Sequence, residues 1–399
     1  MTKCDLVFLT QRIPYPPNKG DKIRSFHILQ RLTRDYRIHL GCFIDDPHDM
    51  RHVPRLSEWC ASVAAIPLKK PVALARGAWH LGTGRSLSEG YFKDRRLVRW
   101  LRETIAKTGA RDMFLFCSAM APYAFGYAAG RTVLMDLVDV DSEKFRSYGE
   151  KSSWPLSALY RREAEMLLAL EKKAALTFDR SFLATANELQ LFLARAPECT
   201  AKTGFFNNGV DSAFYDPALG GQNPYPPGAR VIGFTGAMDY EPNVDAVTWF
   251  ADTVFPAIRA AHSAAQFWIV GANPAPQVEA LAKREGIHVT GRVPDMRPYL
   301  RHAACLVAPL RIARGVQNKI LEGMAMDQTL VATSAAWQGL SAAPGQELFL
   351  AEDAPQFVAT VSAVLDGSIA AHGARQRILH DYDWDRNLDI LVRYLRPRT

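Results

Sequence analysis

Lys319 and Glu322 lie three positions apart in a segment between two apolar runs, 305–310 and 329–336, that read as buried strands. Side chains three apart share one face of a helix. A helix that follows a buried strand offers backbone N–H groups and the positive end of its dipole to a phosphate, and Gly315 allows a ligand to approach the backbone closely. Lysine can contact phosphate oxygens, and glutamate can accept hydrogen bonds from two sugar hydroxyls. The spacing indicates a sugar nucleotide site, with a surface Lys–Glu pair as the alternative.

Motifs of several other enzyme classes are missing from the sequence. There is no G-x-G-x-x-G after the first strand-like run, no G-x4-G-K-[ST] and no G-x-S-x-G, which argues against a dinucleotide oxidoreductase, a P-loop kinase and a serine hydrolase. The histidines lack metal-ligand spacing, and the six cysteines show no C-x-x-C. We therefore expect no metal site and a reducing compartment.

Strand-like runs alternate with amphipathic helical segments along the whole chain, which predicts parallel sheets covered by helices on both faces. One helix begins near Lys22, with apolar residues at every third position. The predicted strands are 5–10, 37–44, 63–68, 112–118, 131–140 and 176–185 in the first half, and 230–236, 266–272, 287–293, 305–310, 329–336 and 347–353 in the second.

The length of 399 residues and this pattern predict an α/β protein with two doubly wound, Rossmann-like domains that face each other across a cleft. We expect a first domain over residues 1–204 and a second over 230–380. The segment 205–229 is rich in Asn, Gly and Pro, so it reads as a linker. Residues 381–399 should form a helix that returns toward the first domain.

The net charge of +7 favours anionic partners. Residues 69–111 hold eleven basic residues against three acidic ones. Within them, segment 93–107 predicts a basic amphipathic helix with one tryptophan, which could lie on an anionic membrane or pack against the core. No nucleic-acid-binding motif occurs, so we expect no nucleic acid partner. Because no apolar run is long enough to span a bilayer, we expect a cytoplasmic protein, with peripheral contact at the inner face of the plasma membrane as an alternative.

Five segments together resemble one enzyme family. "GVQNKILEGMAM" (315–326) resembles the helix that carries the second glutamate of the E-x7-E motif in retaining, two-domain (GT-B) glycosyltransferases of the family 4 type. Segments 14–32, 233–250 and 289–310 resemble the first loop and helix, the first C-domain strand and helix, and the base-binding loop of that family. With segment 138–150, they most resemble the sugar transferases associated with exopolysaccharide and exosortase (PEP-CTERM) gene systems.

The resemblance assigns roles to individual residues. Glu322 would hold the ribose hydroxyls, Arg292 and Val293 would flank the base, and Gly20 would approach the donor phosphate or the acceptor. The remaining donor-binding positions at strand and helix ends would be Gly236, Arg311, Gly315, Val316, Gln317 and Asn318. No metal or other cofactor is implied, because basic side chains and the helix end offset the charge of the leaving diphosphate.

The chain departs from the family pattern in two places. The first glutamate of E-x7-E is replaced by Arg314, and the usual Arg and Lys after the first C-domain strand fall at Ala237 and Pro242. We therefore expect Arg314 and Lys319 to act at the catalytic centre by supplying the missing positive charge, with Arg311 as a third contributor.

Asp139 and Asp141 form a D-x-D sequence at the end of a predicted strand. This motif binds metal in a different, single-domain glycosyltransferase architecture, so the predicted fold argues against a metal here. Asp139 could instead contact the acceptor and assist its hydroxyl as a catalytic group, or the pair could cap a helix that starts near Ser142.

These observations predict a retaining glycosyltransferase that uses a UDP-, GDP- or ADP-sugar and acts on a saccharide or polyprenyl-linked acceptor, with a role in exopolysaccharide synthesis. A nucleotide-sugar epimerase, a basic nucleic-acid-binding protein and a non-catalytic nucleotide-sugar-binding relative are the alternatives.

Overall fold

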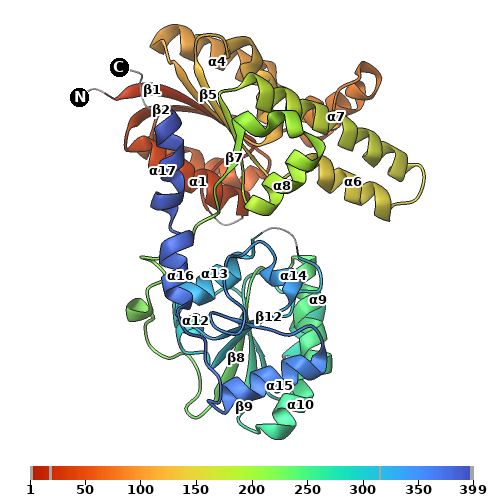
Figure 1. Ribbon diagram of the computed structural model, residues 1–399, viewed down its shortest axis with the longest axis vertical. Coiled ribbons are helices and arrows are strands. Elements are labelled where there is room, and N and C mark those ends of the chain that lie inside the picture. The colour runs from red at the N-terminus through yellow and green to blue at the C-terminus, as the bar shows by residue number, and fades with distance from the viewer. Residues whose placement is uncertain (1–2, 18–19, 314–315, 396–399) are drawn as a thin grey trace. The chain divides into compact units, whose positions relative to one another are not determined.

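Two parallel sheets, each with helices packed around it, form the centres of two units of the chain (Figure 1). Unit 1 comprises residues 1–207 and 385–399, and unit 2 comprises residues 208–384. The computed structural model describes residues 3–17, 20–313 and 316–395. The two sheets confirm the predicted fold class of two doubly wound α/β domains.

The sheet of unit 1 has the strand order β3-β2-β1-β4-β5-β6-β7. Its central strands are apolar runs without alternation, as expected for strands covered on both faces; in β1, residues 6–9 are fully buried. The strands are β1 (Cys4–Thr10), β2 (Tyr36–Ile44), β3 (Cys60–Pro67), β4 (Asp112–Phe116), β5 (Thr132–Val138), β6 (Arg180–Leu183) and β7 (Thr203–Phe205).

The helices of unit 1 include the predicted helix near Lys22, which begins at Gly20. The main helices are α1 (Gly20–Thr33), α2 (Lys70–Trp79), α3 (Leu87–Tyr91), α4 (Arg95–Thr108), α5 (Ala121–Ala124), α6 (Asp141–Lys151), α7 (Leu156–Thr177) and α8 (Ala186–Arg195), with 3-10 segments η1 (Pro47–Glu58), η2 (His80–Thr83), η3 (Ser118–Met120), η4 (Phe125–Tyr127) and η5 (Pro197–Lys202). The C-terminal helix α17 (Trp384–Leu395) packs on unit 1, where the Tyr36 hydroxyl donates to the carbonyl of Leu395 and Arg31 pairs with Asp389.

The sheet of unit 2 has the order β10-β9-β8-β11-β12-β13. Its strands are β8 (Arg230–Thr235), β9 (Ala265–Val270), β10 (Ile287–Val289), β11 (Cys305–Ala308), β12 (Leu330–Ala332) and β13 (Phe349–Leu350). Its helices are α9 (Glu241–Trp249), the π-helical segment η7 (Phe250–Val254), α10 (Phe255–Ala261), α11 (Pro276–Leu281), α12 (Arg297–Arg301), α13 (Asn318–Ala325), α14 (Ser334–Trp337), α15 (Ala354–Leu365) and α16 (Ala374–Asp381), with the 3-10 turn η6 (Pro217–Leu219).

Several predicted strands were too long, among them 347–353, of which only Phe349–Leu350 forms β13. The run 176–185 begins with the last turn of α7, so β6 starts only at Arg180. The run 329–336 contains β12 followed by α14, and only the first three residues of 287–293 form a strand. A short apolar run has the same composition in a buried helix end and in a strand, so the sequence pattern could not separate them.

A buried ion pair joins α1 to β5 in the middle of unit 1. The Arg24 guanidinium donates to both carboxylate oxygens of Asp136, at 2.6 and 3.2 Å, and to the carbonyl of Phe206 at 3.2 Å. It also stacks 3.8 Å above the Phe206 ring. The two charged side chains are 1% and 0% exposed. The sequence analysis did not single out either residue, because nothing in their spacing indicates that they meet.

Removal of one partner of this pair should be costly. We expect Asp136→Ala to lower the free energy of unfolding of unit 1 by about 3–5 kcal/mol, because the guanidinium loses its buried counter-charge. Asp385→Ala breaks a pair with Arg34 in which both side chains are more than half exposed, and it should cost less than about 1 kcal/mol. Urea unfolding followed by circular dichroism measures both variants. Equal losses would contradict a special role for the buried pair.

Candidate active site

The candidate site in unit 2 lies where β8 and β11 end. These strands are neighbours and run parallel, with Leu306 of β11 opposite Gly233 of β8. The loop after β8 leads to α9, and the loop after β11 leads to α13. Because ligands of open parallel sheets bind beyond the carboxyl ends of strands, the two loops lie where a ligand is expected.

Helix α13 begins at Asn318. Gln317 precedes it in an extended conformation, with φ −87° and ψ 102°. Arg314 and Gly315 lie outside the described residues, and their assigned roles stay predictions. The buried face of α13 holds Ile320, Leu321, Gly323, Met324 and Ala325. Lys319 and Glu322 lie off this face and are half-buried, as their spacing predicted.

Lys319 reaches across to the loop after β8. Its Nζ donates to Oδ1 of Asn243 at 2.5 Å and lies 4.2 Å from the centre of the Phe234 ring. The amide of Asn243 in turn donates to the carbonyl of Ala237 at 2.9 Å. A Cβ added to Gly236 would lie 2.6 Å from Nδ2 of Asn243 and 3.3 Å from the lysine Nζ. The structure thus brings two predicted residues, Gly236 and Lys319, into one cluster.

Two glycines shape this edge of the sheet, and the first is Gly236. Its φ of 155° is one that side-chain-bearing residues rarely adopt. A Cβ added to Gly271, which follows β9, would lie 1.6 Å from the carbonyl oxygen of Gly236. The loops after β8 and β9 therefore pack backbone against backbone, next to Asn243 and Lys319.

Burial perturbs the protonation of both charged residues of α13. It lowers the pKa of Lys319 to about 7, although the charge of Glu322 opposes the change. Burial raises the pKa of Glu322, while a hydrogen bond with Tyr215 and the charge of Lys319 act in the opposite direction. A lysine with a pKa near 7 becomes fully charged when an anion binds beside it. The cluster is therefore suited to a diphosphate.

Asn243 and Tyr215 were missed by the sequence analysis. Asn243 follows Pro242 in the first turn of α9, and Tyr215 lies in the segment predicted to be a linker, although the contacts of residues 208–229 place them in unit 2. A polar residue in the first turn after the first strand of this domain was the available signal for Asn243. No local signal existed for Tyr215, because its partner Glu322 is more than 100 positions away.

The other donor-side candidates are spread along the same sheet edge. Arg311 is exposed and forms an ion pair with Asp245 of α9, in which its Nε lies 3.0 Å from a carboxylate oxygen. Arg292 and Val293 follow β10, two strands from β8; the arginine is exposed and the valine is half-buried. Val316 packs against the hydrophobic core of unit 2. The charge of Arg311 is thus partly satisfied by Asp245 in this structure.

Two candidates lie in unit 1. Gly20 is the first residue of α1, and a Cβ added there would have nothing within 4 Å. Asp139 follows β5, and close packing around its carboxyl raises its pKa to about 6, with the charges of Glu188 and Asp141 adding to the effect. The side chain of Asp141 accepts a hydrogen bond from Ser118 at 2.9 Å.

The described residues contain no group of three or more His, Cys, Asp or Glu side chains that could hold a metal ion. Asp141 is the first residue of α6, where its charge favours the helix dipole. With its hydrogen bond from Ser118, Asp141 therefore has a local structural role at the start of α6, whereas no side chain of the pair caps the helix, because the residue before it is Val140.

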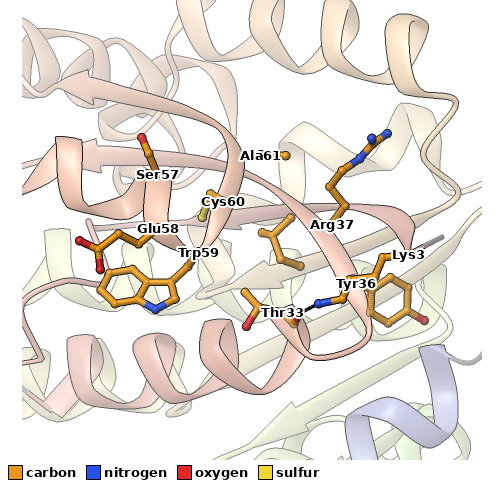
Figure 2. Close-up of a pocket in the computed structure, with 10 residues that line it drawn as sticks. Lys3, Thr33, Tyr36, Arg37, Ser57, Glu58, Trp59, Cys60 and Ala61 are labelled. Carbon is orange, nitrogen blue, oxygen red and sulfur yellow. Dashed lines mark hydrogen bonds between the residues drawn. The ribbon is translucent and has the colours of Figure 1, made fainter. Parts of the chain in front are cut away.

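A hollow of 550 Å³ in unit 1 lies at the edge of its sheet where β2 and β3 begin (Figure 2). Its lining includes Tyr36 and Cys60, the first residues of β2 and β3, together with Trp59 and Arg37. Lys3 there donates to the carbonyl of Thr33 at 2.6 Å. The amino ends of parallel strands are not where ligands of this architecture bind, so we do not assign this hollow to the site.

Residues 229–367 match the family model described as glycosyl transferases group 1. Sucrose-phosphate synthase from Thermosynechococcus elongatus is 14% identical with a TM-score of 0.68 over 98% of both chains. A glycosyltransferase from Rickettsia africae is 12% identical with a TM-score of 0.66 over both full chains. Anabaena HepE in complex with UDP and glucose is 13% identical with a TM-score of 0.64, over 98% of this chain and 99% of its own. No curated protein shows a significant sequence match.

These findings define the fold of the chain. The whole chain has the two-domain GT-B architecture of those structures, and the part that contains α13 has the sequence pattern of group 1 glycosyl transferases. The predicted GT-B resemblance is thereby confirmed.

The lowered pKa of Lys319 should make stability depend on pH. Because its pKa is about 7 in the folded chain and has its ordinary value of 10.5 in the unfolded chain, the folded state binds fewer protons between these values. The contribution of this group to the free energy of unfolding should therefore rise from pH 7 toward pH 10 and stay level below about pH 7, where both states bind the proton. Urea unfolding at about pH 7 and about pH 9.5 should show a smaller rise for Lys319→Met than for the wild type. Lys283→Met, which removes an exposed lysine of the same unit, should follow the wild type. An unchanged rise in Lys319→Met would contradict the assignment.

Proposed function

We propose that the protein is a glycosyltransferase that moves a sugar from a nucleoside diphosphate donor to a hydroxyl of a saccharide or lipid-linked saccharide. The observation that carries the proposal is the cluster of Gly236, Asn243 and Lys319 beside Glu322, at the carboxyl ends of β8 and β11. It lies in the part of the chain that matches the glycosyl transferase family model.

In this proposal the donor diphosphate binds at the start of α13. Backbone N–H groups of the first turn and the Lys319 ammonium face its negative charge, and Arg314, Gly315 and Arg311 add to the site. Glu322 accepts hydrogen bonds from the ribose hydroxyls, and Arg292 and Val293 flank the base. UDP is the first nucleotide to test, because Anabaena HepE was solved in complex with UDP.

The chemistry requires a positive charge beside the leaving group, because negative charge grows on the diphosphate as its bond to the sugar breaks. The acceptor oxygen bonds to the anomeric carbon, the bond from that carbon to the diphosphate oxygen breaks, and the acceptor proton passes to the departing diphosphate. A diphosphate next to Lys319 raises the pKa of the lysine above its value of about 7, so that the ammonium is charged during transfer. Asp139, whose pKa is raised to about 6, is suited to contact the acceptor hydroxyl.

Finer features rest on the resemblance found in the sequence. They are retention of the anomeric configuration, membership of family 4, independence of a bound metal and a role in exopolysaccharide synthesis. In the described ranges 3–17, 20–313 and 316–395, no helix is both long enough and apolar enough to cross a membrane. We propose that the enzyme works in the cytoplasm, on an acceptor presented at the inner face of the plasma membrane.

Nucleotide binding gives the first test. Melting temperatures with UDP, GDP, ADP and their sugar conjugates should rise for one base only. The rise should be measurable, because a ligand at about 100 times its Kd adds about 2.7 kcal/mol to stability. Glu322→Ala should abolish the rise by removing the ribose contact. Glu279→Ala, which removes an exposed glutamate of the same unit, should retain it.

Two results would oppose the proposal. If no nucleotide shifts the melting temperature of the folded protein, the proposed donor site is contradicted. Conversion of the donor sugar to another sugar without an acceptor would instead indicate an epimerase.

A further inference from the structure

The basic helix α4 cannot offer its apolar stripe to a membrane. Leu97, Leu101 and Ile105 form that stripe, and they are 0%, 1% and 8% exposed because they pack in the core of unit 1. The packed-helix alternative for segment 93–107 is therefore the correct one. Exposed apolar residues of unit 1 gather instead on α2, η2 and the start of α7.

An apolar groove of 330 Å³ runs between these elements, and we call it the α2–α7 groove. Its walls come from α2, η2 and α3 on one side and from α6 and α7 on the other, and Figure 1 shows α6 and α7 as a helical pair. The principal lining side chains are Leu74, Leu81, Leu87, Tyr91, Phe145 and Leu159. A groove of this composition fits a hydrocarbon chain better than a polar ligand.

Two consecutive charged residues of α7 hold the groove in shape. Arg162 donates to the carbonyls of His80, Leu81 and Arg85, at 2.9 to 3.2 Å. Glu163 accepts hydrogen bonds from the backbone N–H groups of the first two residues of α3, at 2.6 and 2.9 Å. Because these bonds fasten η2 and α3 to α7, the groove is preformed and needs no ligand to open it.

Large apolar side chains on the elements that form the groove, and in the segment just before α7, are exposed to solvent. Leu74 and Trp79 of α2 are 63% and 78% exposed. Trp154, which precedes α7, is 81% exposed, and Leu156 is 52% exposed. Leu156 and the groove residue Leu159 are three apart on α7, so they share one face. Large apolar side chains that stay exposed beside an apolar groove mark an interaction site, and tryptophan is favoured where apolar and polar surroundings meet.

The charge around the groove indicates the chemistry of the partner. Residues 69–96, which form α2, η2, α3 and their flanks, contain seven basic and two acidic residues. Lys69 and Lys70 at the start of α2 are exposed. Basic side chains beside exposed Trp and Leu match an anionic lipid surface, which offers headgroup charge next to hydrocarbon.

We propose that this face, formed by α2, η2 and the start of α7, docks on an anionic lipid bilayer and places a lipid chain in the α2–α7 groove. Trp79, Trp154 and Leu74 enter the interfacial layer, and Lys69 and Lys70 meet the headgroups. Helix α6 contributes Phe145 to the groove and begins at Asp141, two residues after Asp139. If the proposed function holds, the bilayer delivers a lipid-linked acceptor near Asp139.

Vesicle binding by the full chain tests this docking. The wild type should co-sediment with vesicles that contain about one third phosphatidylglycerol. With vesicles of phosphatidylcholine alone, the protein should remain in the supernatant. Leu74→Ser combined with Trp79→Ser should weaken binding about tenfold or more, because the apolar insertion is lost. Lys69→Glu combined with Lys70→Glu should weaken it comparably at low salt.

The matched control is Val98→Ser on α4. Val98 is 47% exposed and lies in the basic segment outside the groove, so its variant should bind vesicles like the wild type. Melting temperatures in the absence of vesicles should show that all variants remain folded, since every substituted side chain is exposed.

Three outcomes would overturn the proposal. The first is failure of the wild type to bind anionic vesicles, and the second is undiminished binding by the Leu74→Ser/Trp79→Ser variant. The third is a concentration-dependent dimer of the wild type that the same two substitutions abolish, which would make the face a self-association surface. Nucleotide-induced melting shifts in the same variant separate this proposal from the proposed function. If the Leu74→Ser/Trp79→Ser variant loses vesicle binding and keeps its nucleotide shift, the docking proposal is supported. If the wild type binds vesicles but shows no nucleotide shift, docking is still supported and the proposed glycosyltransferase function is contradicted.

Discussion

Parallel pairing of the strands is the constraint from which the candidate sites follow. Each strand pair that the structure describes in either sheet is parallel. The loops after β8, β9 and β11 must therefore emerge at one edge, although more than 30 residues separate each from the next along the chain. This arrangement brings Gly236, Gly271 and the start of α13 together.

Backbone contact at that edge sets the electrostatics of the site. Gly271 allows the loops after β8 and β9 to meet backbone against backbone, and on the other side of Gly236 the Asn243 amide oxygen accepts a hydrogen bond from the Lys319 ammonium. The lysine is held against an aromatic ring and an amide with limited access to water, which lowers its pKa. A fixed, partly desolvated cation of this kind stabilises a leaving anion more strongly than a lysine in water.

Buried charge has a second use in unit 1. Burial raises the pKa of Asp136 even though Arg24 acts against this, so the surroundings oppose an isolated carboxylate there. The full set of contacts that Arg24 makes with Asp136 and Phe206 offsets that cost and joins α1, β5 and the end of β7. Charged side chains have a similar role on α7. Arg162 and Glu163 form hydrogen bonds with backbone groups of η2 and α3, and the lining of the α2–α7 groove is mainly apolar.

The sequence by itself determined the fold class and the Lys319–Glu322 pair, because hydrophobic period and helical spacing are local properties. It also indicated that glycine at position 236 follows a strand. Tertiary structure alone decided which partners these residues meet, since Asn243 and Tyr215 come from segments far along the chain. It likewise decided that the stripe of α4 is buried while the rim of the α2–α7 groove is exposed. Segments 93–107 and 69–96 both combine basic with apolar side chains. Only packing against the remaining elements decides which apolar surface stays exposed to water.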